Sequence, residues 1–172
     1  MHETRLANLL GAAVLNLSDR MTGAAAAAAG VSLSGTAALV VLAEFPGLGG
    51  TELGRRIGIG QPACARMLDQ LAARGLVRRQ AKSGRAVAVV LTRAGRSAAN
   101  RALEARRNVL AGALTAVSDP DALEPLLEQL LRGLHGEVRS GDLMCRLCDR
   151  PGCVAQDRIC PVGQAQRELG AP

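Results

Sequence analysis

The chain has 172 residues, enough for one domain with an appendage, and its formal net charge is +6 at pH 7. Arginine supplies nearly all of the positive charge, since Lys82 is the only lysine, and Phe45 is the only aromatic, which argues against binding single-stranded nucleic acid by base stacking. No apolar run reaches transmembrane length and the N-terminus lacks the pattern of a secretion signal, so we expect a cytoplasmic protein that does not enter a membrane.

Apolar residues recur at helical spacing over residues 6–21, which predicts an amphipathic first helix. The alanine-rich run at residues 23–30 either extends this helix or is low-complexity filler, and we favour filler. Ser34 is expected to cap the next helix, an apolar segment that ends before Pro46.

A helix–turn–helix pattern follows. Thr51 is expected to cap a short helix in which Leu53 and Ile57 point inward, and the Gly-Ile-Gly sequence after it predicts a tight turn. The next helix, residues 61–74, opens with a proline in its first turn and has a predicted buried stripe of Cys64, Met67, Leu68 and Leu71. Cys64 is therefore expected to be a small core residue.

Two segments rich in β-branched residues, 76–80 and 86–91, flank a basic tip and predict a β-hairpin. Thr92 is expected to cap a long helix over residues 93–117, whose leucines form a seam for a partner helix. After a break at Asp-Pro-Asp, residues 123–138 carry the clearest helical stripe of leucines in the chain.

Positive charge is concentrated on this central module. Ten Lys and Arg residues lie between Leu53 and Arg96 against a single acidic residue, which gives a local charge of +9. A helix–turn–helix followed by a hairpin with a cationic tip is the plan of a winged helix, with a recognition helix (61–74) for the major groove of double-stranded DNA and a wing (78–90) for phosphates or the minor groove. The alternative is a solvated basic surface on an ordinary helical domain. The residues expected to contact DNA are Thr51, Gln61, Ala63, Ala65, Arg66, Arg78, Lys82, Ser83 and Arg85.

The segment TELGRRIGIGQPACARMLDQLAARGLVRR, followed after a short tip by GRAVAVVLTRAG, resembles the winged-helix core of MarR-type transcriptional regulators. The resemblance covers residues 34–95 by motif and continues by architecture through the helices that follow. The wing of that family usually carries an aspartate where this chain has Ser83. We therefore expect the wing to contact DNA through Lys82 and Arg85.

The resemblance implies a mainly α fold with a small β-hairpin wing, in which a winged helix-turn-helix core (residues 31–95) is flanked by dimerisation helices (1–30 and 96–140). It also implies a homodimer on a palindromic operator, for which we favour the role of a repressor. The leucine stripes at 6–21 and 123–138 agree with a dimer, because they exceed the apolar surface that a small winged core covers. Packing within one chain is the alternative.

Residues 141–172 form a cysteine-rich tail outside this resemblance. Clustered cysteines in a reducing compartment more often form a metal or redox site than a disulfide framework. Four thiolates suit a tetrahedral zinc ion, which we favour; the alternatives are an iron–sulfur cluster, a reversible disulfide and a disordered tail with no cofactor. The candidate ligands are Cys145, Cys148, Cys153 and Cys160.

The leading interpretation is a homodimeric DNA-binding regulator whose occupancy is modulated by a small ligand, a metal or the thiol state. The alternative is a winged-helix module for protein contacts with a structural zinc tail. An enzyme is not expected, because His2 lies at the terminus and His135 on the polar flank of a leucine helix. No Ser/His/Asp, Cys/His or paired-carboxylate arrangement is visible in the sequence.

Overall fold

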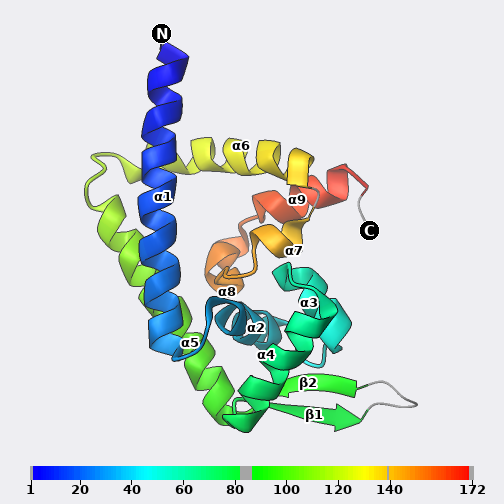
Figure 1. The fold of residues 1–172 in the computed structure, drawn as a ribbon. Helices are drawn as coiled ribbons and strands as arrows, with labels where there is room; N and C mark the ends of the chain where they lie inside the picture. The colour runs from blue at the N-terminus through cyan, green and yellow to red at the C-terminus, as the bar shows by residue number, and fades with distance from the viewer. Residues whose placement is uncertain (1, 82–86, 139, 171–172) are drawn as a thin grey trace.

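The structure, a computed structural model, describes residues 2–81, 87–138 and 140–170 (Figure 1). As predicted, it is mainly α-helical with one antiparallel hairpin of two strands. The elements in chain order are α1 (His2–Ala29), α2 (Leu33–Glu44), α3 (Gly50–Ile57), α4 (Gln61–Ala73), β1 (Val77–Ala81), β2 (Val87–Leu91), α5 (Arg93–Leu114), α6 (Pro120–Val138), α7 (Gly141–Met144), α8 (Arg150–Cys153), a short 3-10 turn (Ala155–Asp157) and α9 (Pro161–Glu168).

Helices α1 and α5 pack along one another and form one side of the molecule (Figure 1). The contact is made by small side chains, because Ala25 and Ala29 of α1 and Ala102 of α5 are all buried together. The Arg101 Nε also donates a hydrogen bond to the Ala28 carbonyl, at 3.0 Å. The interpretation of the alanine run as filler is therefore wrong: it is the last part of α1, and its short side chains let the two helices approach closely.

Helix α2 is the centre of the core, with every residue from Gly35 to Leu42 buried. Its cap is Ser32, whose Oγ accepts a hydrogen bond from the Gly35 N–H at 3.2 Å, whereas the predicted cap, Ser34, already lies in the first turn. Helix α3 likewise begins one residue before the predicted Thr51 cap, with Gly49 at the cap position and no side-chain cap. In both cases the N-cap lies two residues before the predicted one.

The hairpin pairs Val77 with Leu91 and Ala81 with Val87. Strand β1 begins and ends one residue later than the predicted segment 76–80. A single bridge between Leu48 and β2 ties the hairpin to the segment before α3. Thr92 caps α5 as predicted: its Oγ1 accepts from the Gly95 N–H at 3.0 Å and donates to the Gly75 carbonyl at 2.6 Å. Because α5 starts at Arg93, the predicted core boundary at residue 95 falls inside this helix.

Two leucine-rich helix faces lie uncovered in the single chain. On α1 the exposed side chains include Leu6, which is 68% exposed, and on α6 they include Leu126, which is 60% exposed. Figure 1 shows the first turns of α1 projecting beyond the other helices. Packing within one chain therefore does not cover these stripes.

The tail folds into short helices between α6 and the winged core, and α7 packs on α3 while α9 packs on α6 (Figure 1). Leu147 joins the main hydrophobic core, and Val162 and Ala165 are also buried. The alternative of a disordered tail is therefore wrong for residues 140–170. No single helix in the described parts of the chain is long and apolar enough to span a membrane. Helices α1 and α2 together have the length and composition of a membrane span, but the chain bends by 75° between them.

Candidate functional site

Helix α4 presents two faces of opposite character. Its buried face is the predicted stripe of Cys64, Met67, Leu68 and Leu71. Cys64 is a core residue as expected, since its thiol donates to the Gly50 carbonyl at 3.2 Å and burial raises its pKa. The opposite face is exposed and carries Gln61, Ala63, Ala65 and Arg66. Small side chains and one arginine are what a helix needs to enter a DNA groove.

The turn between α3 and α4 sets the angle of this face. Gly58 ends α3 with a φ of +75°, a left-handed conformation that favours glycine. Thr51, Gln61 and Ala65 then line a shallow hollow together with Arg79 of β1. The structure thus brings three of the predicted DNA-contact residues beside the hairpin, and it adds Arg79, which pairs with Asp69 at 2.7 Å.

Two arginines of the basic module are already neutralised. Arg55 and Arg56 each bond to Glu52 and to Asp142 of α7, at distances of 2.7–2.9 Å. The hydrogen bond from Arg55 lowers the pKa of Glu52 from 4.5 to about 2. Arg56 also lies over the Phe45 ring, 4.4 Å from its centroid. The charge counted along the sequence therefore overstates the positive charge available on α3.

Among the residues expected to contact DNA, the exposed cations that the structure describes are on α4 and β1. Arg66 and Arg78 are exposed, and neither forms an ion pair with any side chain that the structure describes. The other predicted wing residues, Lys82, Ser83 and Arg85, lie outside the described residues. Arg74 is used internally, because it donates to the Gly30 carbonyl at 2.6 Å and so ties α4 to the end of α1.

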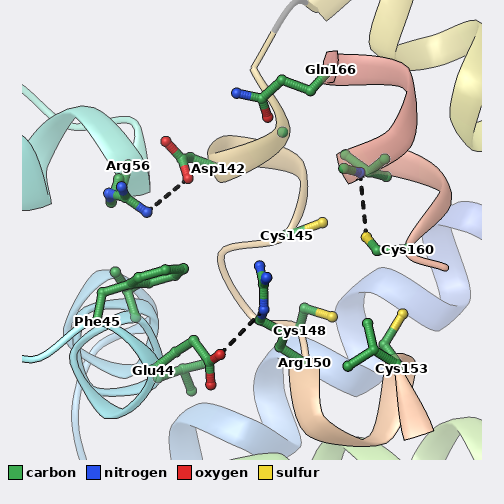
Figure 2. Close-up of a pocket in the computed structure, with 16 residues that line it drawn as sticks. Glu44, Phe45, Arg56, Asp142, Cys145, Cys148, Arg150, Cys153, Cys160 and Gln166 are labelled. Carbon is green, nitrogen blue, oxygen red and sulfur yellow. Dashed lines mark hydrogen bonds and ion pairs between the residues drawn. The ribbon is translucent and has the colours of Figure 1, made fainter. Parts of the chain in front are cut away.

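A second site lies where the tail meets α2 and α3. Figure 2 shows the four tail cysteines together with Phe45 and Arg56 among the residues that line one cavity. The volume of this cavity is about 100 Å³. Glu44 of α2 pairs with Arg150 of α8 across the same boundary, at 3.2 Å. We call Cys145, Cys148, Cys153 and Cys160 the four-cysteine site; the structure brings all of these predicted ligands together.

The four thiols are free and interact with one another. A hydrogen bond with Cys148 lowers the pKa of Cys145, and the same bond raises the pKa of Cys148. Burial raises the pKa of Cys153 to about 11, with further effects from Cys148 and Cys160. As these side chains stand, no group of three or more His, Cys, Asp or Glu residues in the described segments is arranged to hold a metal ion.

Two polar side chains near the tail are buried in a way that the sequence does not indicate. His135 is fully buried, not on an exposed polar flank as expected, because α6 turns this residue away from solvent where α7 and α9 pack. Both of its ring nitrogens lack a hydrogen-bond partner in the described structure, as does the buried Nε of Arg106 on α5. Arg106 lines a second cavity together with the whole four-cysteine site.

Comparison with known proteins gives one consistent family. A model of the MarR family matches residues 29–86. No curated protein sequence matches significantly. Among solved structures, the MarR family protein Rv2887 of Mycobacterium tuberculosis in complex with salicylic acid is 30% identical; the match covers 70% of this chain and 95% of that chain, with a TM-score of 0.54.

Two other solved structures are similar over comparable lengths. A transcriptional regulator of the MarR family from Silicibacter pomeroyi is 27% identical and has a TM-score of 0.62, with 79% of this chain and 94% of that chain covered. The transcriptional repressor CouR, solved bound to a 23-mer DNA duplex, is 28% identical and has a TM-score of 0.59, with 73% and 89% covered.

Proposed function

The chain belongs to the MarR family of transcriptional regulators, and from this membership we propose that it acts as a homodimeric repressor on a palindromic DNA operator. The observation that carries the proposal is the exposed face of α4, where Arg66 stands among small side chains and forms no ion pair with any described residue. The structure of a relative, CouR, bound to a DNA duplex supports the proposal that this chain binds double-stranded DNA. This role would place the protein in the cytoplasm and would require no catalytic chemistry.

We assign the DNA contacts in two groups. Gln61, Ala63 and Ala65 on α4 are short enough to let the helix approach base edges, and Arg66 can reach a guanine or a phosphate. Thr51 and Arg78 flank α4 and would contact the backbone of the DNA. The wing tip, with Lys82, Ser83 and Arg85, would reach the adjacent minor groove or its phosphates.

The homodimer is supported by the uncovered leucine faces of α1 and α6. Full burial of one leucine side chain is worth about 1.5–3 kcal/mol, so a second copy that covers both faces could offset the cost of association. A dimer would also place two α4 helices on one side, as a palindromic site requires. Sedimentation should therefore give a dimer at micromolar concentration.

A small-molecule effector is also part of the proposal. The Rv2887 structure was solved with salicylic acid, which shows that a relative of this fold takes a small aromatic acid. We propose that an effector of this kind changes the occupancy of the operator here. The expected readout is a change in DNA affinity when salicylate is titrated into the protein–DNA complex.

The test of DNA reading is substitution of Arg66. A duplex would be selected from a random-sequence pool by the wild-type protein, and its affinity for Arg66→Ala measured by fluorescence anisotropy at several salt concentrations. We expect affinity to fall about tenfold and, if Arg66 binds phosphate, the salt slope to decrease by about one. Arg167→Ala is the matched control, because Arg167 is an exposed arginine on α9, far from the hairpin in Figure 1.

The opposite results are clear. If the wild-type protein selects no duplex from the pool even at low salt, the proposal that it binds DNA is refuted. The alternative, a winged-helix module that contacts other proteins, would then be the better interpretation. If Arg66→Ala binds as tightly as Arg167→Ala, α4 is not the recognition helix.

A further inference from the structure

The four-cysteine site gathers thiols from separate short elements of the tail. Cys145 is the C-cap of α7, Cys153 is the last residue of α8 and Cys160 is the N-cap of α9, so each of these cysteines lies at a helix end. Figure 2 shows the four labelled cysteines with their sulfur atoms turned toward a common space. This convergence over sixteen positions of sequence is what a shared ligand requires, because it brings soft donors around one point.

The same four thiols line two cavities. Cys145, Cys148, Cys153 and Cys160 all face the cavity that includes Phe45 and also the cavity that includes Arg106. A tail that needed only apolar packing would have no use for four adjacent thiols.

Arg106 provides an independent observation. Its Nε is buried without a hydrogen-bond partner among the described residues, and it lines the same cavity as the four cysteines. A buried N–H without a partner is unfavourable, and an anion in that cavity would satisfy it. Four thiolates around a metal carry a net negative charge, which would meet this requirement.

The tail also has little hydrophobic core of its own. Helices α7 and α8 have four residues each, far shorter than a helix that is stable by itself. Few tail side chains are buried, chiefly Leu147, Val162 and Ala165. A metal bound at the ends of these helices would supply the missing constraint, as it does in small domains with little core.

From these observations we propose that the four-cysteine site binds one metal centre through its thiolates, as a Zn²⁺ ion or an iron–sulfur cluster. In this structure the four side chains are free thiols. On binding, each cysteine releases its proton to solvent and its S–H bond is replaced by a sulfur–metal bond, with no change in the oxidation state of sulfur. The side chains would rotate to reach zinc–sulfur distances of about 2.3 Å or the wider spacing of a cluster.

The test is to purify the full chain without oxygen and to measure zinc, iron, inorganic sulfide and visible absorption. Zinc in equimolar amount with no visible band, or iron with sulfide and a visible band, supports the proposal and identifies the form. A metal-free protein with reduced thiols, or one with disulfides, overturns it.

A pair of cysteine variants locates the metal. Cys148→Ser should lose it, whereas Cys64→Ser should keep it, because Cys64 lies in the α4 core and its hydroxyl replacement can still bond to Gly50. Equal metal content in both variants would also overturn the proposal. If Cys148→Ser does not fold, the metal content of the wild-type protein decides by itself. None of these measurements depends on DNA binding, so this proposal and the proposed function fail separately.

Discussion

At the scale of single residues, the most consequential contact is one that joins distant parts of the chain. Asp142 bonds to Arg55 and Arg56 across 87 and 86 positions of sequence. Glu52 shares the same two cations, so two carboxylates and two guanidiniums form one network. Such networks fix geometry more than they add stability, since exposed ion pairs contribute about 0–1 kcal/mol each.

This network predicts a pH dependence. The Arg55 hydrogen bond lowers the pKa of Glu52 from 4.5 to about 2 in the folded state. Its stabilising contribution is therefore present above pH 4.5 and is lost as the pH falls toward about 2. We expect the free energy of unfolding of Glu52→Gln, measured with urea, to fall less steeply with acid than that of the wild type. Glu104→Gln, on an exposed site of α5, should follow the wild-type curve.

Local patterns were sufficient for residues whose role depends on their own helix. The buried stripe of α4, from Cys64 to Leu71, follows from helical periodicity alone, and the Thr92 cap follows from its position before a helical segment. The partners of Asp142 and the buried position of the Arg106 Nε could not be predicted, because nothing in the sequence near either residue indicates which distant groups surround it. The four-cysteine site is intermediate: spacing indicated a site, and only the fold shows that all four thiols converge.

At the scale of elements, the start of a helix was less predictable than its existence. Ser32 and Ser34 can both cap α2, and the choice depends on where the chain leaves α1. The alanine run was ambiguous for another reason: alanine favours a helix but has little apolar contrast, so periodicity cannot reveal a buried face. The buried face of this run is set by α5, whose Ala102 packs in one cluster with Ala25.

The junction of the wing with α5 gives a prediction with an internal control. A Cβ at Gly95 would collide with the Leu76 carbonyl, whereas a Cβ at Gly112, on the same helix, would meet nothing within 4 Å. We expect Gly95→Ala to destabilise the protein by about 2 kcal/mol or more, because the backbone between α4 and β1 must move. Gly112→Ala should instead stabilise it by about 0.5–1 kcal/mol through helix propensity. Chemical denaturation measures both, and equal effects would refute the close approach.

At the scale of the whole molecule, the tail is placed to influence the DNA-binding module. Helix α7 has Cys145 as its C-cap and carries Asp142, which bonds to both arginines of α3. Its Leu143 lies over Gly58, so close that a Cβ on that glycine would stand 2.6 Å from the Leu143 Cδ1. The same short helix therefore contacts the four-cysteine site and the turn that orients α4.

This arrangement predicts that the metal state of the tail changes DNA affinity through Asp142. If the proposed metal fixes α7, its removal should release Asp142 from Arg55 and Arg56 and alter the α3–α4 turn. We expect wild-type affinity for the selected duplex to differ about fivefold or more between metal-loaded and metal-stripped protein, the usual scale of coupling between two sites. In Asp142→Asn that difference should shrink to less than about twofold, since the amide forms weaker bonds to the arginines.

Glu44→Gln is the control for this coupling, because it breaks the Glu44–Arg150 ion pair between the tail and α2 without touching α3. In Glu44→Gln, the difference in DNA affinity between metal-loaded and metal-stripped protein should equal that of the wild type. If Asp142→Asn and Glu44→Gln behave alike, α7 does not carry the signal. If the wild-type protein shows no difference, the metal centre only holds the tail in place, and control of the operator must come from a ligand bound elsewhere.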